Sequence, residues 1–315
     1  MPTVLVTVDL PEKSKELLEK QSFQVNYLSD EKELEKEIAA ADVLITAVNV
    51  TITKEMLENA ENLKLIANIG DGYSNIDIAT ARAKNILITN TPTYAAIQST
   101  AELTITILLA LSRNIRKGQE ICEQNQFKGW RVTGYLGGHQ VSNKKIAIIG
   151  FGRVGQKVAK IANALDMSVM FVDPKDISTD IMDKLNAKKV SLDKALTEAD
   201  YVTLNCSAND DNYHMITKNE LKKMRKEAYL INCARGSLLK ETDLVDALRE
   251  KEIAGAALDV HEFEPEFTEG LLQLSNVVMT PHIGNDTYEA RNEMAQEAVR
   301  QTIQLFQGKE INDLV

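Results

Sequence analysis

Three glycines at G-x-G-x-x-G spacing, Gly150, Gly152 and Gly155, are the residues of this sequence whose types and spacing point most directly to a chemistry. In a turn of this kind the first glycine permits a tight bend, the second lets the backbone approach a pyrophosphate, and the third lets helix and strand pack closely. The N–H groups and the positive dipole end of the helix then face the phosphates. Asp173 follows Gly155 by 18 residues, where a carboxylate can accept hydrogen bonds from ribose hydroxyls.

The elements that would position these residues occur in the required order. An apolar run at 146–149 has the length of a strand that is buried on both faces. Apolar residues then recur at helical spacing at Val154, Val158, Ile161 and Leu165. A second apolar run, 168–172, ends at Asp173. A lone glycine motif could be only a turn between strand and helix, but its context here favours a dinucleotide site.

Three further charged residues each follow an expected strand, and so could supply catalysis. Arg235 comes after the strand at 228–232, Glu264 after that at 254–259, and His282 after that at 277–280. A nicotinamide enzyme needs an acid or base near the hydride and a cation for a substrate carboxylate. From pattern alone the choice stays open, because a loop Arg or Glu is usually a solvated charge and a loop His is usually structural.

The whole chain alternates strand-like and helix-like segments, which predicts α/β architecture with parallel sheets. We expect two Rossmann-like, doubly wound domains: a substrate-binding domain at 1–98 and 288–315, and a dinucleotide-binding domain at 99–287. The substrate domain would be discontinuous, because the final helix at 288–307 is expected to return to it. A helix at 100–116, unbroken until Gly118, and an irregular arm at 124–143 would lie between the two strand-rich regions.

Composition excludes several other classes of protein. The 315 residues are 44% apolar and 26% charged, as in a globular protein, with a formal net charge of −10. That balance argues against nucleic-acid and membrane-surface partners. No secretion signal and no membrane-spanning run are expected, and three widely spaced cysteines fit reduced thiols in the cytoplasm. His and Cys residues at metal-ligand spacing are missing, so no metal site is expected.

A series of motifs spread over nearly the whole chain resembles one family. The series is NIGDGYSNID, NTPTYAAIQSTAE, FKGW, KKIAIIGFGRVGQ, NYHMI, LINCARGSLL, AGAALDVHEFEP and TPHIGNDTYEAR. It resembles the D-isomer-specific 2-hydroxyacid dehydrogenases, and within them the glyoxylate/hydroxypyruvate reductase-like branch, whose fold is that of formate and glycerate dehydrogenases. The order and spacing of so many motifs are highly specific.

The resemblance implies roles for residues that pattern alone leaves open. Arg235 would pair with the carboxylate and carbonyl of a 2-oxo acid, through the planar donor fork of its guanidinium. His282 would donate a proton to the carbonyl oxygen, and Glu264 would pair with His282 and favour its protonated form. Asp71 and Gly72 would lie in the loop that holds the substrate carboxylate, and Tyr94 could limit the side-chain pocket or simply pack.

The family pattern also implies a set of cofactor contacts. Asp259 would reach the nicotinamide carboxamide. The full expected set is Thr100, Gly150, Gly152, Arg153, Val154, Gly155, Asp173, Cys206, Ser207, Asn212, Cys233, Ala234 and Asp259. Trp130 and Tyr135 could lie in an arm that contacts a partner subunit, and the family forms dimers through the long helix at 100–116.

Two departures from the family pattern bear on substrate and cofactor. Asp71 stands where the family usually has a small or apolar residue, and its charge should repel a carboxylate unless it points away or is neutralised. Asn205-Cys206-Ser207 replaces the usual His-x-Pro, which would reshape the wall near the adenine. Asp173 favours NAD over NADP because a carboxylate opposes a 2′-phosphate, although Lys175 could partly offset that charge.

These observations predict a cytoplasmic, homodimeric, NAD-dependent D-2-hydroxyacid dehydrogenase that reduces glyoxylate, hydroxypyruvate or pyruvate. One alternative keeps the chemistry with another substrate range, such as D-lactate. The other is a non-catalytic dinucleotide-sensing protein on the same fold, which the three retained residues Arg235, Glu264 and His282 argue against.

Overall fold

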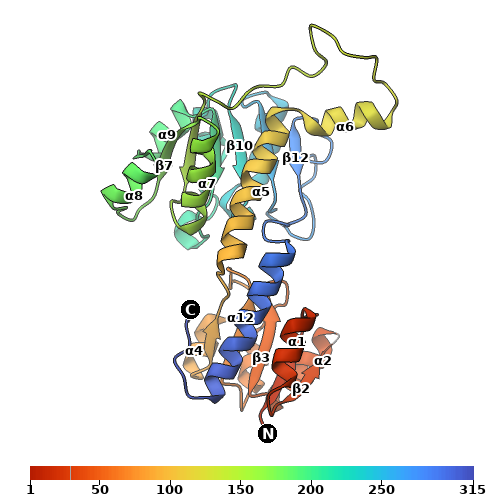
Figure 1. The fold of residues 1–315 in the computed structure, drawn as a ribbon, viewed down its shortest axis with the longest axis vertical. Coiled ribbons are helices and arrows are strands. Elements are labelled where there is room, and N and C mark those ends of the chain that lie inside the picture. The colour runs from red at the N-terminus through yellow and green to blue at the C-terminus, as the bar shows by residue number, and fades with distance from the viewer. Residues whose placement is uncertain (29) are drawn as a thin grey trace. The chain divides into compact units, whose positions relative to one another are not determined.

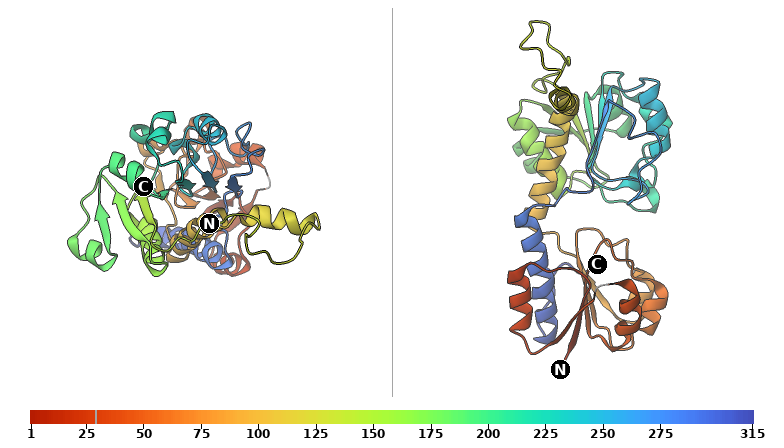
Figure 2. Two further views of the ribbon diagram at one scale, coloured as in Figure 1. Left: turned by 90° about the horizontal axis from the view of Figure 1, so that it is seen from above. Right: turned by 90° about the vertical axis from the view of Figure 1, so that its right-hand side faces the viewer.

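The computed structural model describes residues 1–28 and 30–315 and divides into two compact units. Unit 1 comprises Met1–Ala96 and Asn285–Val315, and unit 2 comprises Ile97–Gly284. Each is built on a fully parallel sheet with helices on both faces (Figures 1 and 2), so the predicted fold class is confirmed, including the discontinuity of the first unit. The assignment of a substrate domain and a dinucleotide domain, with boundaries at 98/99 and 287/288, stays a prediction.

Unit 1 has a five-stranded sheet in the order β2-β1-β3-β4-β5. Its strands are β1 (Thr3–Val6), β2 (Gln24–Tyr27), β3 (Val43–Ala47), β4 (Leu65–Ile69) and β5 (Leu87–Thr89). Its helices are α1 (Glu12–Glu19), α2 (Glu31–Glu37), the 3₁₀ turn η1 (Ile38–Ala40), α3 (Lys54–Asn59), α4 (Ile78–Ala83) and α12 (Tyr288–Phe306). The return of α12 follows from its buried stripe, which packs in one core cluster with alternate residues of β1, β3 and β4.

Unit 2 has a seven-stranded sheet in the order β12-β11-β10-β9-β6-β7-β8. Its strands are β6 (Lys145–Ile149), β7 (Ser168–Val172), β8 (Ala187–Lys189), β9 (Tyr201–Leu204), β10 (Tyr229–Asn232), β11 (Gly255–Leu258) and β12 (Val277–Met279). Its helical segments are α6 (Ile115–Glu123), α7 (Arg153–Ala164), α8 (Thr179–Lys184), α9 (Leu192–Glu198), η2 (Asp210–Asn212), α10 (Lys218–Lys223), η3 (Gly236–Leu238) and α11 (Glu241–Arg249). Helix α5 (Tyr94–Ser112) begins at the end of unit 1 and runs into unit 2.

The continuous apolar runs of the strands have a direct structural cause. Successive side chains of a strand point to opposite faces, so a strand covered by helices on both sides must be apolar throughout. In β6, Ile146 and Ile148 join the core beneath α5 and α7, whereas Ala147 and Ile149 join the core beneath α9 to α11. This alternation fixes the register of the strand that leads into the glycine turn.

The prediction of one helix at 100–116, unbroken until Gly118, was wrong at both ends. Helix α5 already begins at Tyr94, because the carboxylate of Glu293 accepts a hydrogen bond from the Ala95 N–H at 2.7 Å, a cap supplied from far along the chain. The helix ends where Asn114 takes a left-handed conformation, with φ of +51°, and its side chain donates to the Leu136 carbonyl. Gly118 lies inside α6.

Helix α5 is long and apolar enough to cross a membrane by length and composition alone. Half of it is buried inside the protein, and Ile105, Leu108 and Leu111 belong to the core of unit 2. These contacts are those of a core helix. The segment 124–144 contains no helix or strand, in agreement with the expected irregular arm.

Candidate active site

The glycine turn after β6 has three distinct steric requirements. A Cβ on Gly150, which has a φ of +94°, would lie 2.6 Å from the backbone nitrogen of Cys206. A Cβ on Gly155 would lie 2.2 Å from the Gly150 carbonyl oxygen, so only glycine lets α7 approach the turn. Gly152 precedes the first residue of α7 and has nothing within 4 Å of its Cβ position. The turn is therefore closed toward the protein and open in front of the helix.

This arrangement fits the pyrophosphate of a dinucleotide. The first turn of a helix leaves N–H groups without intrahelical partners, and the positive end of the helix dipole lies there too. The open space at Gly152 lets an anion reach those groups, and a side chain at that position would occupy it. In the first turn of α7, Arg153 is exposed, and Val154 packs against the core.

Asp173, directly after β7, is held against the glycine turn. Its Oδ2 accepts a hydrogen bond from the Phe151 N–H at 2.7 Å, and its Oδ1 accepts one from the Lys175 N–H at 2.8 Å. Each carboxylate oxygen can accept a further hydrogen bond, so the group remains available to two ribose hydroxyls. Asp173 is therefore a fixed anion beside the turn.

The segment after β9 forms the facing wall of the turn, since the backbone of Cys206 is what a side chain at Gly150 would strike. The Asn212 side chain donates to the Ser207 carbonyl at 2.7 Å and so fixes this wall. Burial raises the pKa of the Cys206 thiol to about 11 and that of the Cys233 thiol to about 12. Both thiols are neutral at physiological pH, which makes them packing groups.

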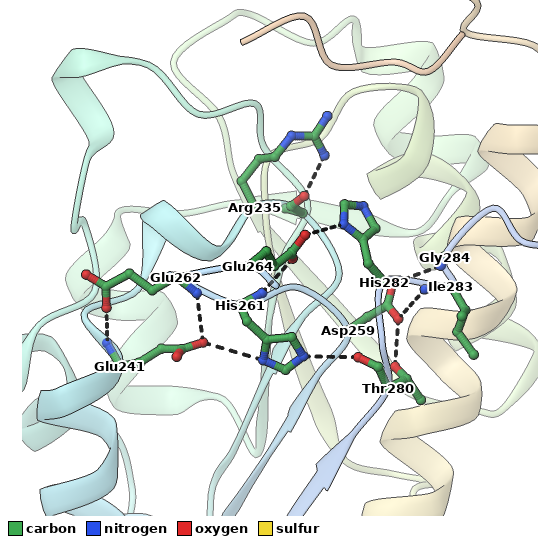
Figure 3. A network of polar contacts seen from close by, with 11 residues as sticks. Arg235, Glu241, Asp259, His261, Glu262, Glu264, Thr280, His282, Ile283 and Gly284 are labelled. Carbon is green, nitrogen blue, oxygen red and sulfur yellow. Dashed lines mark hydrogen bonds and ion pairs between the residues drawn. The ribbon is translucent and has the colours of Figure 1, made fainter. Parts of the chain in front are cut away.

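Arg235, Glu264 and His282 follow β10, β11 and β12, which are neighbours in the sheet. The carboxyl ends of parallel strands meet at one edge, so three residues far apart in sequence come together there (Figure 3). The Arg235 side chain donates to the Ala234 carbonyl at 2.6 Å. Asn232, which sequence inspection missed, stabilises this turn with two hydrogen bonds. Its Oδ1 accepts one from the Ala234 N–H, and its Nδ2 donates one to the Arg235 carbonyl.

Glu264 and His282 form a hydrogen-bonded pair. Glu264 Oε2 lies 2.8 Å from His282 Nδ1, and the two side chains are 37% and 40% exposed. Burial alone would raise the pKa of Glu264, but the hydrogen bonds from His282 and from the His261 N–H outweigh it and hold that pKa below its ordinary value. An ionised carboxylate can only accept, so Nδ1 carries a proton and Nε2 faces away from Glu264. The pair presents an oriented imidazole.

His282 has a backbone conformation that a side-chain-bearing residue rarely adopts, with φ of +54°. Asp259 holds it there: its buried carboxylate accepts hydrogen bonds from the Ile283 N–H, the Gly284 N–H and the Thr280 hydroxyl, at 2.8, 2.8 and 2.6 Å. The His282 N–H donates to the Asp259 carbonyl. Strain of this kind persists where surroundings impose it, commonly at functional sites. The expected contact of Asp259 with a nicotinamide carboxamide stays a prediction.

Of the expected substrate-site residues, the two loop residues Asp71 and Gly72 and the pocket candidate Tyr94 lie in unit 1. The loop after β4 is tight, because a Cβ on Gly70 would lie 2.3 Å from Val48 Cγ1. Asn68 donates to the Gly72 carbonyl and Asn90 to the Asp71 carbonyl, both at 2.8 Å. Asp71 and Tyr94 are exposed. Thr100 lies in unit 2 beside Gly284, near the turn of His282.

Comparison with known proteins identifies a family that the chain matches along its sequence and its fold. Residues 105–284 match the model of the D-isomer specific 2-hydroxyacid dehydrogenase, NAD binding domain. A Staphylococcus epidermidis protein that carries the name 2-hydroxyacid dehydrogenase is 42% identical over 98% of both chains. A Thermus thermophilus crystal structure superposes with a TM-score of 0.91 at 33% identity, covering 99% of each chain. A glyoxylate reductase from Paecilomyes thermophila gives a TM-score of 0.90 at 27% identity, covering 100% of this chain and 98% of that one.

Proposed function

This chain belongs to the D-isomer-specific 2-hydroxyacid dehydrogenases, oxidoreductases that act on the CH–OH group of 2-hydroxy acids, and we propose that it reduces a small 2-oxo acid to the D-2-hydroxy acid with NADH. Glyoxylate, hydroxypyruvate and pyruvate are the substrates we favour. The observation that carries the proposal is the Glu264–His282 pair, which stands beside Arg235 at the edge formed by β10, β11 and β12.

The bound dinucleotide supplies a hydride for the carbonyl carbon of the substrate. Arg235 binds the substrate carboxylate and orients the carbonyl, since its guanidinium offers paired donors to two oxygens. His282 donates a proton from Nε2 to the carbonyl oxygen, which completes reduction of C=O to CH–OH. Glu264 keeps the imidazole in place and stabilises its protonated form before the transfer.

Asp173 supports NAD as the cofactor. Its fixed carboxylate can accept hydrogen bonds from both ribose hydroxyls, whereas a 2′-phosphate would bring a second anion to the same place. Cofactor contacts from Gly150 to Gly155 and from the wall at Cys206 and Ser207 belong to the same proposal.

A small substrate is supported by the similarity to a glyoxylate reductase. Asp71 further disfavours substrates that carry a second anion, because its exposed carboxylate would lie in the carboxylate-holding loop. Gly72 and Tyr94 complete the proposed substrate set.

We also propose that the protein is a cytoplasmic homodimer. The arm at 124–144 exposes Phe127, Trp130 and Val132, and the Trp130 side chain is 84% exposed. Large apolar side chains gathered on one projecting segment are characteristic of a protein contact surface. A dimer buries them.

The decisive experiment follows absorbance at 340 nm with purified protein, NADH or NADPH, and a panel of 2-oxo acids. The panel comprises glyoxylate, hydroxypyruvate, pyruvate, phenylpyruvate, 2-oxoisocaproate and 3-phosphohydroxypyruvate. We expect turnover with NADH on the first three acids and D-configured product from the chiral ones. Tight NADH binding without turnover of any acid would refute the enzyme assignment of this site and favour a dinucleotide-sensing protein.

A further inference from the structure

A cluster of two histidines and two glutamates lies next to the Glu264–His282 pair, and Figure 3 shows three of its members, Glu241, His261 and Glu262. We call His214, Glu241, His261 and Glu262 the His–Glu cluster. Glu241 and Glu262 exchange hydrogen bonds, since the backbone N–H of each donates to the carboxylate of the other, at 2.9 and 3.1 Å. Each carboxylate also faces one imidazole: Glu262 lies 2.7 Å from His214 Nε2, and Glu241 lies 3.7 Å from His261 Nδ1.

His261 connects the two loops that carry the catalytic pair. Its Nε2 lies 3.0 Å from the carbonyl oxygen of Thr280, two residues before His282. Its backbone N–H donates at 2.8 Å to Glu264 Oε1, which leaves Oε2 for His282. The His261 ring packs edge-on against Phe267, with centroids 4.7 Å apart. One residue therefore fixes both the glutamate and the strand end from which the histidine projects.

The environment of the His261 ring favours the imidazolium. A carbonyl oxygen only accepts, so Nε2 carries a proton, and Nδ1 faces a carboxylate oxygen at ion-pair distance. Burial lowers the pKa of His261, but Glu241, the Thr280 carbonyl and Glu264 outweigh burial, and the net pKa lies above its ordinary value. Among the described residues, Glu241 and Glu264 are the ionisable groups that raise it. The side chains of His261 and Glu241 are almost completely buried, so solvent screens this charge weakly.

We propose that His261 is a positioning residue for the acid–base pair: its buried imidazolium ties the Glu264 loop to the Thr280 strand end and places a fixed positive charge beside Glu264. The inference rests on the proposed function, because it assigns His261 to the same reaction. It follows that His261 acts on the rate and on the pH dependence of proton donation, while binding of the dinucleotide is independent of it.

The sign of the effect on pH dependence follows from charge alone. A cation beside the pair stabilises the Glu264 carboxylate and opposes a second cation on the imidazole, so the pair releases its proton at a lower pH than it would without His261. Removing the charge should therefore shift the alkaline limb of the pH profile of kcat/KM for reduction to higher pH, by about one unit.

Two variants separate charge from shape. His261→Phe keeps a ring of similar size and loses both the charge and the Nε2 donor, whereas His261→Gln keeps an N–H donor and loses the charge. We expect both to shift the alkaline limb of kcat/KM upward. We expect kcat to fall about three- to ten-fold in His261→Phe and less in His261→Gln, because one oriented hydrogen bond is at stake. The KM for NADH should stay within about two-fold of wild type.

The matched control is His139→Gln, a histidine change in the exposed arm that should leave the pH profile unchanged. An unshifted alkaline limb in both His261 variants would overturn the proposal. If neither variant folds, ¹⁵N-histidine spectra of the wild-type protein decide: a His261 ring that stays doubly protonated to a higher pH than the exposed His139 ring supports the proposal, and a His261 ring that loses its second proton at the same or a lower pH refutes it.

These outcomes are distinguishable from failure of the proposed function. Wild-type protein without turnover on any 2-oxo acid would refute the function while the spectrum still reported the charge of His261. Turnover in the wild type with unshifted His261 variants would refute only the positioning role.

Discussion

Two alanine substitutions in the glycine turn should have opposite effects on stability, and the one that stabilises should weaken cofactor binding. Gly152→Ala places a methyl group where nothing lies within 4 Å, at a φ of −76° that any residue adopts. Replacing glycine where the backbone already suits alanine stabilises a protein by about 0.4–1 kcal/mol, chiefly because the unfolded chain loses freedom. For a unit of this size, that corresponds to a rise in Tm of roughly 1–4 °C.

The same methyl group should weaken NADH binding. It occupies the space through which a pyrophosphate would approach the helix N-terminus, and a charge-assisted hydrogen bond contributes about 1.5–3 kcal/mol. Loss of one such bond raises the Kd about 10- to 100-fold. In Gly155→Ala, by contrast, the methyl group would meet the Gly150 carbonyl at 2.2 Å, and overpacking of this kind costs about 1–3 kcal/mol of stability.

Differential scanning fluorimetry of the apoprotein and NADH titration by fluorescence test both effects on the same samples. We expect Gly152→Ala to melt at or above the wild-type temperature and to bind NADH weakly, and Gly155→Ala to melt lower. Wild-type affinity in Gly152→Ala would show that the pyrophosphate does not approach this turn. Wild-type stability in Gly155→Ala would contradict the close packing of α7 on it.

Three further predictions follow from the charges and pKa values of the structure. Burial raises the pKa of the Cys206 thiol to about 11 and that of the Cys233 thiol to about 12, so iodoacetamide at pH 8 should label the exposed Cys122 first. Mass spectrometry reads the labelling, and equal labelling of all three thiols in the folded protein would contradict the burial of Cys206 and Cys233. Asp173→Asn should lower the ratio of kcat/KM with NADH to kcat/KM with NADPH about ten-fold or more, because it removes a negative charge that would face a 2′-phosphate. The control variant Asp176→Asn should leave this ratio unchanged. An unaltered ratio in Asp173→Asn would remove the basis for the proposed preference for NAD. Stability should be lost in acid, because the folded-state pKa is lowered for four carboxyl groups, those of Asp42, Glu220, Asp243 and Glu264. Such a group stabilises the protein fully above its ordinary pKa, near 4, and loses that contribution as the pH falls through its lowered folded-state pKa. We expect the Tm to be level from pH 7 to about 5 and to fall below about pH 4, and a Tm that is still level at pH 3 would contradict this.

Sequence patterns predicted what local physics determines. Strand β6, the glycine turn and Asp173 were recognisable because buried strands are apolar throughout and because each glycine meets a steric demand within its own βαβ unit. The fold class followed from the alternation of such units. Arg235, Glu264 and His282 were ambiguous as single residues, since their proximity depends on the order β12-β11-β10 of the sheet, and only resemblance to a family suggested their roles.

Features that depend on distant partners escaped prediction. The start of α5 at Tyr94 depends on a cap from Glu293, and its end depends on a left-handed Asn114 held by Leu136. The His–Glu cluster gave no signal either, because single glutamates and histidines in a sequence look solvated until the fold brings them together. Asn232 had a usable signal: an Asn side chain often bonds the backbone two residues on, as here with Ala234.

In the proposed mechanism His282, held by Glu264, donates the proton when a 2-oxo acid is reduced. The most direct test is kcat/KM for the best 2-oxo acid with NADH in His282→Gln and in wild type, with NADH affinity measured on the same samples. We expect a loss of about a hundred-fold or more in kcat/KM with NADH affinity unchanged. Turnover by His282→Gln within a few-fold of wild type would contradict it.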